Sequence, residues 1–361
     1  MKILDLRPWP VRAWTRGQEG RAVAGKEPVR LARWAARLTD LVVARRVGRR
    51  ESPPPGLTVI SVGNLAFGGT GKTPVVAALG RELAARGWPG AVLTRGYGSR
   101  QPGPCIVAPA DQTAGDEARL LASALAASGW LVVQSRNRWR GLELLAEELP
   151  RGAVVLLEDG HQTARVGRHL DVLILDRWAL EDTPHGPVLR PQTGPVAPFG
   201  PWRESAAGAA RADVWLVETA DPPPAAPGGR AVSGFQRRLS LYDGRGTATP
   251  PPRGAPWAAL SGIARPWAFE ASAAALCGGP PLLAIRCADH APYDAALRAR
   301  IGAAIARVGA PLTVTTEKDW IKLQAVWPLE LPVAVARLEV RWTGARTLPD
   351  LVGERCDACW E

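Results

Sequence analysis

The chain has 361 residues, 46% of them hydrophobic, so it is long enough for two domains of ordinary size and its composition excludes wholesale disorder. The net charge is +11, and a net +8 of it falls within residues 1–51, which favours an anionic partner such as phospholipid headgroups, nucleic acid or a phosphorylated substrate. No apolar run reaches the roughly 18 residues of a membrane span, and the N-terminus lacks the apolar core of a secretory signal, so we expect a protein of the cytosol or of a cytosolic surface.

Residues 1–52 form a basic segment whose main feature is a predicted helix over 27–50. Leu31, Trp34, Leu38 and Leu41 recur there at helical spacing. Arg30, Arg33 and Arg37 form a stripe one position before the first three of them. An apolar face edged by Arg is typical of a helix that lies on a membrane surface. Packing of that face on the protein's own domain is the alternative, and the pattern leaves both open.

Residues 53–220 form a predicted domain in which strands alternate with helices. Buried strands are expected at 57–63, 91–96, 154–160, 171–176 and 213–218, and helices at 73–87, 116–128 and 137–149. This alternation predicts an α/β fold with a largely parallel sheet and helices on both faces.

A Pro- and Gly-rich connector is predicted at 221–255, with a two-stranded ribbon as one option inside it. A second, smaller α/β domain follows over 256–361. Its predicted elements are a strand from 257, helices at 266–278 and 293–308, and strands at 281–287 and 311–315. The five scattered Cys suit a reducing compartment, and the CxxC at 356–359 lacks the further ligands of a zinc site, so we expect reduced, non-catalytic thiols.

The stretch SVGNLAFGGTGKTP at 61–74 places a glycine-rich turn between a predicted strand and a predicted helix. Backbone N–H groups in such a turn and the positive end of the helix make an anion site. The strict phosphate-loop pattern has its first Gly where this chain has Ala66, but the strand–loop–helix context supports nucleotide binding and a P-loop kinase-type fold. Lys72 would reach the β- and γ-phosphates of ATP, and the Thr73 hydroxyl would ligate Mg²⁺. The predicted nucleotide-binding residues are Gly68, Gly69, Thr70, Gly71, Lys72 and Thr73.

Acidic residues complete the predicted site. VVLLEDG supplies Glu158 and Asp159 at the end of a neighbouring strand, where a carboxylate can hold Mg²⁺ directly or through water. A kinase also needs a group that deprotonates the acceptor hydroxyl, and Asp116 and His290 are the candidates. As isolated residues, Asp116 also reads as a helix N-cap and His290 as a structural histidine.

Several motifs together resemble the lipid A 4′-kinase family, tetraacyldisaccharide 4′-kinase. They occur in family order over about residues 30–325. The motifs are VGN-x-x-x-GGTGKTP (62–74), RGYG (95–98), GDE (115–117), EDGHQ for D-D-G-x-Q (158–162), GPVLR for G-P-L-R (186–190), SGI-x-x-P (261–266), D-H-x-x-Y (289–293) and TTEKD (315–319).

The resemblance implies a two-domain α/β enzyme on the cytoplasmic face of the inner membrane. Such an enzyme transfers the ATP γ-phosphate to the 4′-hydroxyl of an acylated glucosamine disaccharide 1-phosphate. It implies Asp116 as the base, His290 as its partner, Asp159 as a metal-linked carboxylate and Arg190 near the phosphates. The N-terminal helix would contact acyl chains and an anionic membrane surface.

Four positions near the implied site depart from the family pattern. Glu158 replaces the first Asp of D-D-G, Thr163 replaces a His, Ala118 replaces the Pro of GDEP, and Pro191 follows Arg190 where the family has Glu. These departures bear on metal geometry, substrate detail and rate more than on fold or ATP binding.

A partitioning or positioning switch ATPase is the alternative function for this loop. Such ATPases carry a signature Lys directly before the glycine pair, and this chain has Phe67 at that position, which counts against the alternative. The DHAPY and TTEKD motifs also have no role in a switch ATPase. Nucleic-acid binding rests on charge alone, and because no zinc finger, helix-turn-helix or RNA-sheet motif supports it, we expect no nucleic-acid partner.

Overall fold

The computed structural model describes residues 1–7, 29–48, 50–68, 71–184, 186–197, 199–328 and 330–360. The chain forms two compact units: a larger unit of residues 27–237 and 340–361, and a smaller unit of residues 1–26 and 238–339. The chain passes from one unit to the other within β13 (Ala231–Asp243) and again within β17 (Val333–Thr343). Residues 340–361, which the sequence analysis assigned to the smaller domain, therefore belong to the larger unit.

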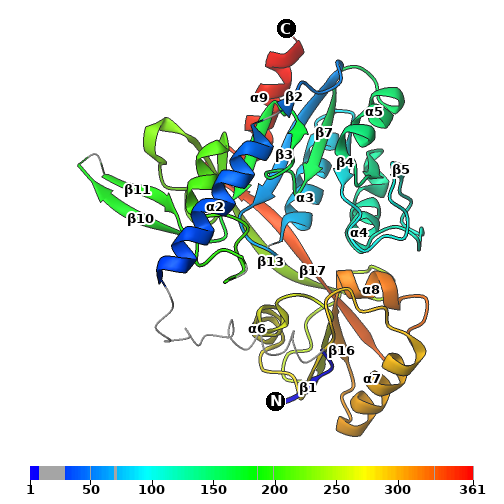
Figure 1. Cartoon of the computed structure of the whole chain (residues 1–361). Helices are drawn as coiled ribbons and strands as arrows, with labels where there is room; N and C mark the ends of the chain where they lie inside the picture. The colour runs from blue at the N-terminus through cyan, green and yellow to red at the C-terminus, as the bar shows by residue number, and fades with distance from the viewer. Residues whose placement is uncertain are drawn as a thin grey trace. The chain divides into compact units, whose positions relative to one another are not determined.

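A mostly parallel sheet forms the centre of the larger unit (Figure 1). Its strand order is β13-β12-β9-β3-β7-β4-β6-β5, and the described pairs are parallel except for the short edge pair β5–β6. The strands are β3 (Leu57–Asn64), β4 (Gly90–Thr94), β5 (Cys105–Ile106), β6 (Leu131–Gln134), β7 (Ala153–Glu158), β9 (Leu170–Ile174) and β12 (Val214–Glu218).

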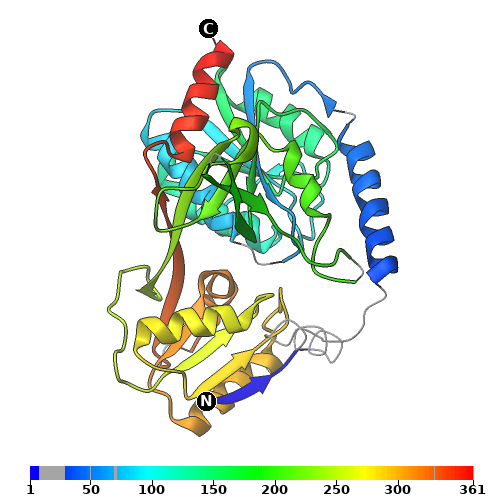
Figure 2. The ribbon, with the colours of Figure 1, turned by 90° about the vertical axis from the view of Figure 1, so that its left-hand side faces the viewer.

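Helices cover both faces of this sheet (Figures 1 and 2). In β7, Val154 and Leu156 pack in the cluster that contains residues of α3, α4 and α9, whereas Val155 and Leu157 pack in the cluster of α5. Because both faces are buried, the strands are continuous apolar runs rather than alternating ones. The helices are α3 (Lys72–Ala85), α4 (Asp116–Leu125), α5 (Arg138–Glu148) and α9 (Leu348–Trp360).

Further elements lie around the sheet of the larger unit. The helix α2 (Val29–Val47) runs along its outside, and β10 (Trp178–Thr183) and β11 (Gly186–Pro191) form an antiparallel hairpin (Figure 1). Among the described residues, no helix has both the length and the apolar character needed to cross a membrane. The remaining elements are β2 (Arg50–Glu51), β8 (Arg165–Val166) and the 3₁₀ turns η1 (Ala126–Ser128), η2 (Ala206–Arg211) and η3 (Pro227–Gly229).

The smaller unit contains a further run of parallel strands, in the order β1-β15-β14-β16-β17. Phe269 and Ala273 of α6 pack on one face, and Ile301 and Ile305 of α7 pack on the other. The elements are β1 (Lys2–Asp5), β14 (Ala258–Ser261), α6 (Pro266–Cys277), β15 (Leu283–Arg286), α7 (Ala295–Val308), β16 (Thr313–Thr316) and α8 (Glu317–Leu323).

The predicted fold class, an α/β fold with a mostly parallel sheet and helices on both faces, is confirmed. Residues 231–243 differ from the expectation, because they form the strand β13 in parallel with β12 within the predicted connector. Residues 2–5 were not predicted as a strand, and they pair in parallel with 283–286.

Candidate active site

The glycine turn follows β3 and leads directly into α3. All eight residues of β3 are buried, which fixes the start of the turn, and α3 begins at Lys72 with Gly71 as its N-cap. Gly68 and Gly71 have φ values of 75° and 71°, a region that glycine adopts without a steric penalty. Gly69 and Thr70 lie outside the described residues. The turn thus ends at a helix N-terminus, as an anion site requires.

Lys72 and Thr73 reach the two predicted carboxylates at the end of β7. Thr73 Oγ1 donates to Glu158 Oε1 (2.6 Å), and Lys72 Nζ lies 3.5 Å from Asp159 Oδ1. Lys72 Nζ also donates to Asn64 Oδ1 at the end of β3 (3.0 Å). The structure therefore brings together the Lys, the hydroxyl and both carboxylates expected from the sequence.

The two carboxylates are in different electrostatic states. Burial and the charge of Glu117 raise the pKa of Glu158 to about 7. Burial would also raise the pKa of Asp159, but Lys72 and Arg203 outweigh it and lower that pKa to about 2. Asp159 is thus a stable anion beside the glycine turn, whereas Glu158 holds its charge weakly in the absence of a further cation.

Arg203 is a site residue that the sequence analysis missed. Its Nη1 donates to Asp159 Oδ1 (2.7 Å) and Gln162 Oε1 (3.1 Å), and its Cζ lies 5.2 Å from the ring centroid of Phe67. The backbone positions it, because Arg203 N donates to Leu65 O and Phe67 N donates to Pro201 O, each at 2.8 Å. Its Nε is buried and has no hydrogen-bond partner among the described residues.

Arg190, the arginine that the sequence analysis placed near the phosphates, has other surroundings. It lies on β11, forms an ion pair with Glu181 of β10 and is half-exposed. A signal for Arg203 was present in the sequence, since GPWRE at 200–204 has an Arg followed by Glu, as the G-P-L-R-E pattern requires. This segment, rather than the one around Arg190 and Pro191, is therefore the one that contacts Asp159 among the described residues.

Glu204 connects this arginine segment to the EDGHQ motif. The Glu204 side chain is fully buried, and it accepts hydrogen bonds from Gln162 Nε2 (2.7 Å) and Arg211 Nη2 (2.6 Å). Gln162 Nε2 also donates to Asn64 O (2.8 Å), next to the glycine turn. The network holds the segment of Arg203 and the segment of Asp159 in one arrangement.

Asp116 is the first residue of α4 and lies in the larger unit, as Lys72 does. The backbone before it is tightly packed, since a Cβ on Gly115 would lie 2.6 Å from Tyr97 O in the RGYG turn. Gly115 N donates to Gln134 Oε1 (3.0 Å). The charge of the neighbouring Glu117 acts on Glu158, so the GDE motif belongs to the same electrostatic environment as the end of β7.

Arg138 is a buried cation beneath the carboxylates. Its guanidinium donates to Leu93 O (2.8 Å) and to Glu158 O, and burial lowers its pKa to about 10. It therefore ties together the carboxyl ends of β4 and β7. A buried arginine at these carbonyls had no sequence signal beyond its place at the start of a predicted helix.

His290 lies in the smaller unit, where three motifs meet. Its Nε2 lies 3.2 Å from Lys318 Nζ, which donates to Asp289 Oδ1 (2.9 Å). The buried Asp319 accepts hydrogen bonds from Gly262 N (2.9 Å) and Tyr293 OH (2.8 Å). Asp319 thus joins the SGI, DHxxY and TTEKD segments around the turn of His290.

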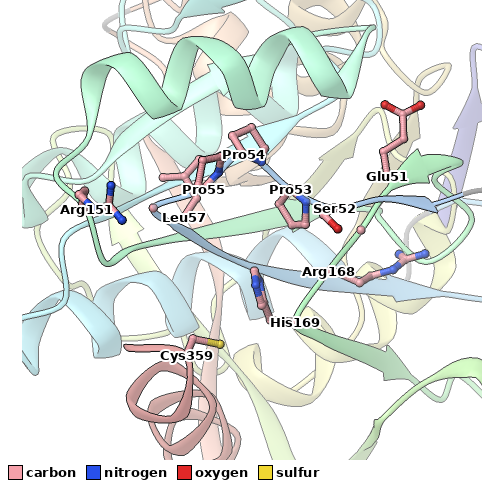
Figure 3. A pocket seen from close by; sticks show the side chains of 12 residues that line it. Glu51, Ser52, Pro53, Pro54, Pro55, Leu57, Arg151, Arg168, His169 and Cys359 are labelled. Carbon is pink, nitrogen blue, oxygen red and sulfur yellow. The ribbon is translucent and has the colours of Figure 1, made fainter. Parts of the chain in front are cut away.

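A separate groove of about 640 Å³ lies at the amino end of β3 (Figure 3). Figure 3 shows Arg151 beside the Pro54–Pro55 segment and the ring of His169 directed toward Cys359 of α9. None of the predicted site residues lines this groove. All five Cys are free, and no group of three or more His, Cys, Asp or Glu within the described ranges is arranged to hold a metal ion.

Comparisons with known proteins agree with the motifs. The family model described as tetraacyldisaccharide-1-P 4′-kinase matches residues 28–356. A tetraacyldisaccharide 4′-kinase of Phenylobacterium zucineum (strain HLK1) is 38% identical over 301 residues, which cover 79% of this chain and 82% of that protein. The corresponding protein of Dinoroseobacter shibae (strain DSM 16493 / NCIMB 14021 / DFL 12) is 38% identical over 311 residues, 82% of this chain and 83% of its own length.

The fold also has a counterpart among solved structures. A crystal structure of LpxK from Aquifex aeolicus, described as an apo form in complex with ATP, superposes with a TM-score of 0.65. The superposition covers 90% of this chain and 96% of the chain in that crystal structure, and the two sequences are 24% identical. This likeness concerns the arrangement of the elements.

Proposed function

The chain belongs to the tetraacyldisaccharide-1-P 4′-kinase family, and from this premise we propose how its residues carry out the reaction. The protein is an ATP-dependent kinase of lipid A biosynthesis. Its substrate is a tetraacyl glucosamine disaccharide 1-phosphate, which is phosphorylated at the 4′-hydroxyl. The switch-ATPase alternative is not favoured, because the family match spans both units rather than the glycine loop alone.

The reaction breaks the bond between the γ-phosphorus and its bridging oxygen and forms a bond to the 4′-oxygen of the sugar. Negative charge spreads over the γ-phosphoryl oxygens and the leaving group, and the sugar hydroxyl loses its proton. Catalysis therefore needs cations around the phosphoryl group and a base beside the hydroxyl.

One observation carries the nucleotide part of the proposal: Lys72 and Thr73, at the N-terminus of α3, contact Asp159 and Glu158 at the end of β7. The loop from Gly68 to Thr73 would hold the phosphates through backbone N–H groups, and Lys72 would neutralise the β- and γ-phosphates. Arg203, already directed toward Asp159, would stabilise the charge of the transferring group in place of Arg190.

The residues around Thr73 suit Mg²⁺. A hard cation prefers oxygen ligands, and the hydroxyl of Thr73 meets the carboxylate of Glu158 at 2.6 Å beside Asp159. We propose that these three side chains hold Mg²⁺ directly or through water, together with ATP. When bound, Mg²⁺ would supply positive charge that offsets the charge of the phosphates. The longer Glu158 reaches the Thr73 hydroxyl, so its extra methylene is compatible with this role.

We propose Asp116 as the base that accepts the proton of the 4′-hydroxyl and His290 as its partner in the reaction. The family resemblance supports both roles, and the two residues belong to different units. The structure supports the setting of each one: Asp116 follows a tightly packed glycine, and His290 lies in a turn organised by Asp319.

We also propose that the protein works at the cytoplasmic face of the inner membrane, with α2 on an anionic lipid surface. Leu38, Leu41 and Val42 of α2 are exposed by 63%, 52% and 47%, and the neighbouring Arg37 and Arg45 are exposed as well. Apolar side chains flanked by basic ones are the pattern of an interfacial helix. An acylated substrate is drawn from such a surface.

The test is ATP-dependent phosphate transfer to a tetraacyl disaccharide 1-phosphate in detergent micelles. We expect Lys72→Ala to abolish transfer, Asp116→Ala to lower kcat by roughly 10²–10⁴-fold, the range of a general base, and His290→Ala to lower kcat while ATP still binds. Asp182→Ala, on the exposed strand β10, is the control for loss of a carboxylate. Wild-type protein that binds ATP but transfers nothing would overturn the function, and a folded Asp116→Ala variant with normal kcat would overturn the base.

A further inference from the structure

A second arginine, Arg237, lies against the glycine turn. It belongs to β13, which runs parallel to β12 so that Phe235 stands opposite Glu218 at the carboxyl end of the sheet. Arg237 Nη2 donates to Glu218 Oε2 (2.6 Å), and its backbone N–H donates to Glu218 Oε1 (3.3 Å). Its Cζ lies 5.4 Å from the ring centroid of the buried Phe235. One carboxylate and one ring thus fix the direction of the guanidinium.

The contact with the turn is close. A Cβ placed on Gly71 would lie 2.2 Å from Arg237 Nη1 and 3.3 Å from its Cζ. Gly71 is favoured for its positive φ, and a side chain there would also displace the guanidinium. The approach brings Nη1 to the backbone at the N-cap of α3.

Several positive charges lie close together at this position. The N-terminus of α3 carries partial positive charge, Lys72 adds a full one, and Arg237 adds another. Glu218 balances one of these charges, and Asp159 is shared between Lys72 and Arg203. A polyanion at the turn would be attracted to this group of cations.

We infer that Arg237 binds an oxygen of the β- or γ-phosphate of ATP at the glycine turn and that Glu218 positions it for this contact. The inference rests on the proposed role of the turn as the ATP site and adds a nucleotide-binding residue from outside the phosphate-loop motif. Because Glu218 and Phe235 already order the guanidinium, little side-chain entropy is lost when the phosphate binds.

The neighbouring Arg238 provides a matched control. It is the next residue of the same strand, so its side chain projects from the opposite face of the sheet, and it is exposed. Arg237→Met and Arg238→Met remove the same charge from adjacent positions. A long-range electrostatic effect on ATP would be similar in both variants, whereas a direct contact would be lost in one only.

The experiment measures equilibrium binding of ATP and of AMP by calorimetry, which does not depend on lipid phosphorylation. We expect Arg237→Met to weaken ATP binding by roughly 10- to 100-fold, the range of a charge-assisted hydrogen bond, and to change AMP binding by less than about threefold. Arg238→Met should stay within about threefold of the wild-type affinity for ATP, and Glu218→Gln should weaken ATP binding less than Arg237→Met does.

Normal ATP affinity in a folded Arg237→Met variant, or an equal loss for ATP and AMP, would overturn the inference. If Arg237→Met does not fold, Arg237→Lys gives the test, because it keeps the charge but loses the two-pronged geometry and should show the same selective loss on a smaller scale. A wild-type protein that binds ATP but phosphorylates no lipid would overturn the proposed function and leave this inference standing.

Discussion

At the scale of single residues, Arg203 and Arg190 both lie in the larger unit but differ in their surroundings. Arg203 contacts Asp159 and stacks on Phe67, whereas Arg190 is half-exposed and pairs with Glu181 in a hairpin. A charge directed at the reacting phosphate is worth far more than a solvated surface pair.

We therefore expect Arg203→Gln to lower kcat by roughly 10²–10³-fold and Arg190→Gln to change it by less than about threefold. Steady-state transfer assays with both variants measure this difference. If Arg190→Gln lowers kcat strongly and Arg203→Gln leaves kcat normal, Arg190 is the arginine near the phosphates, as expected from the sequence.

His169 gives the larger unit a pH dependence. Its Nδ1 accepts a hydrogen bond from Val59 N (2.9 Å), so the neutral ring is the form that fits. Burial and the charge of Arg355 lower the pKa of His169 below its usual value of 6.5. Above pH 6.5 the ring is neutral in both folded and unfolded chains, and below it the unfolded chain binds the proton more readily, so the stability of the folded state falls as the pH decreases.

We expect His169→Gln to flatten the fall in thermal stability between pH 7 and pH 5 relative to the wild type. Thermal unfolding followed by circular dichroism at several pH values measures it. Identical slopes for the two proteins would contradict this role of His169.

At the scale of elements, α2 has one packed side and one exposed side. Asp40 accepts hydrogen bonds from Ser205 N (2.8 Å) and Ser205 Oγ (2.6 Å), and Val47 is buried. Leu38 and Leu41, which the sequence placed on the apolar stripe, are more than half exposed. The helix is therefore held by one side, and its apolar leucines remain on the other.

If this exposed side lies on lipid, Leu38→Asp and Leu41→Asp should each weaken binding to anionic vesicles by roughly tenfold or more, since burying a Leu side chain contributes about 1.5–3 kcal/mol. Leu180→Asp, on the exposed face of β10, is the matched control and should leave binding unchanged. Vesicle co-sedimentation measures the affinities. Equal binding of all three variants would contradict the membrane role of α2.

The strands that were predicted well from the sequence are those whose continuous apolar residues show that both of their faces are buried. Continuous apolar runs identified β3, β7 and β9 to within about two residues, because both sheet faces are covered. The short strand β1 contains Lys2 and Asp5 and depends on the edge of β15, so no local pattern indicated it. In the long strand β13 only Ser233, Gly234, Phe235 and Leu241 are buried, so no long apolar run distinguishes it from a connector.

The site residues likewise divide into those that a local sequence pattern predicted and those that it did not. Lys72, Thr73, Glu158 and Asp159 follow strands at predictable places, and the parallel order brings the ends of β3 and β7 together. Arg203 and Arg237 come from segments far along the chain, and only tertiary pairing brings them to the turn. Periodicity carries no information about such contacts.

At the scale of the whole molecule, each unit has its own core, and damage to one should spare the other. In the smaller unit, Glu270 of α6 and Arg286 of β15 form a buried ion pair with two contacts of 2.7 Å. Removing one partner leaves the other charge buried without compensation, which costs about 3–5 kcal/mol.

We expect Glu270→Ala to destabilise the smaller unit by about this amount and to abolish lipid phosphorylation, while ATP binding to the larger unit persists. Hydrogen exchange resolved by unit, together with calorimetry of ATP binding, measures both effects. Glu317→Ala, which breaks the more exposed pair with Arg337, is the control and should cost less than about 1 kcal/mol. Loss of ATP binding in Glu270→Ala would show that the units do not unfold separately.

The interleaving of the two units along the chain has a consequence for synthesis. Leu351, Val352 and Cys356 of α9 belong to the core beside α3, so the larger unit cannot complete that core until residues 340–361 have left the ribosome. The parts of the smaller unit, 1–26 and 238–339, are all available before then. The larger unit therefore depends on its last segment, and one face of α3 stays uncovered until α9 has been made.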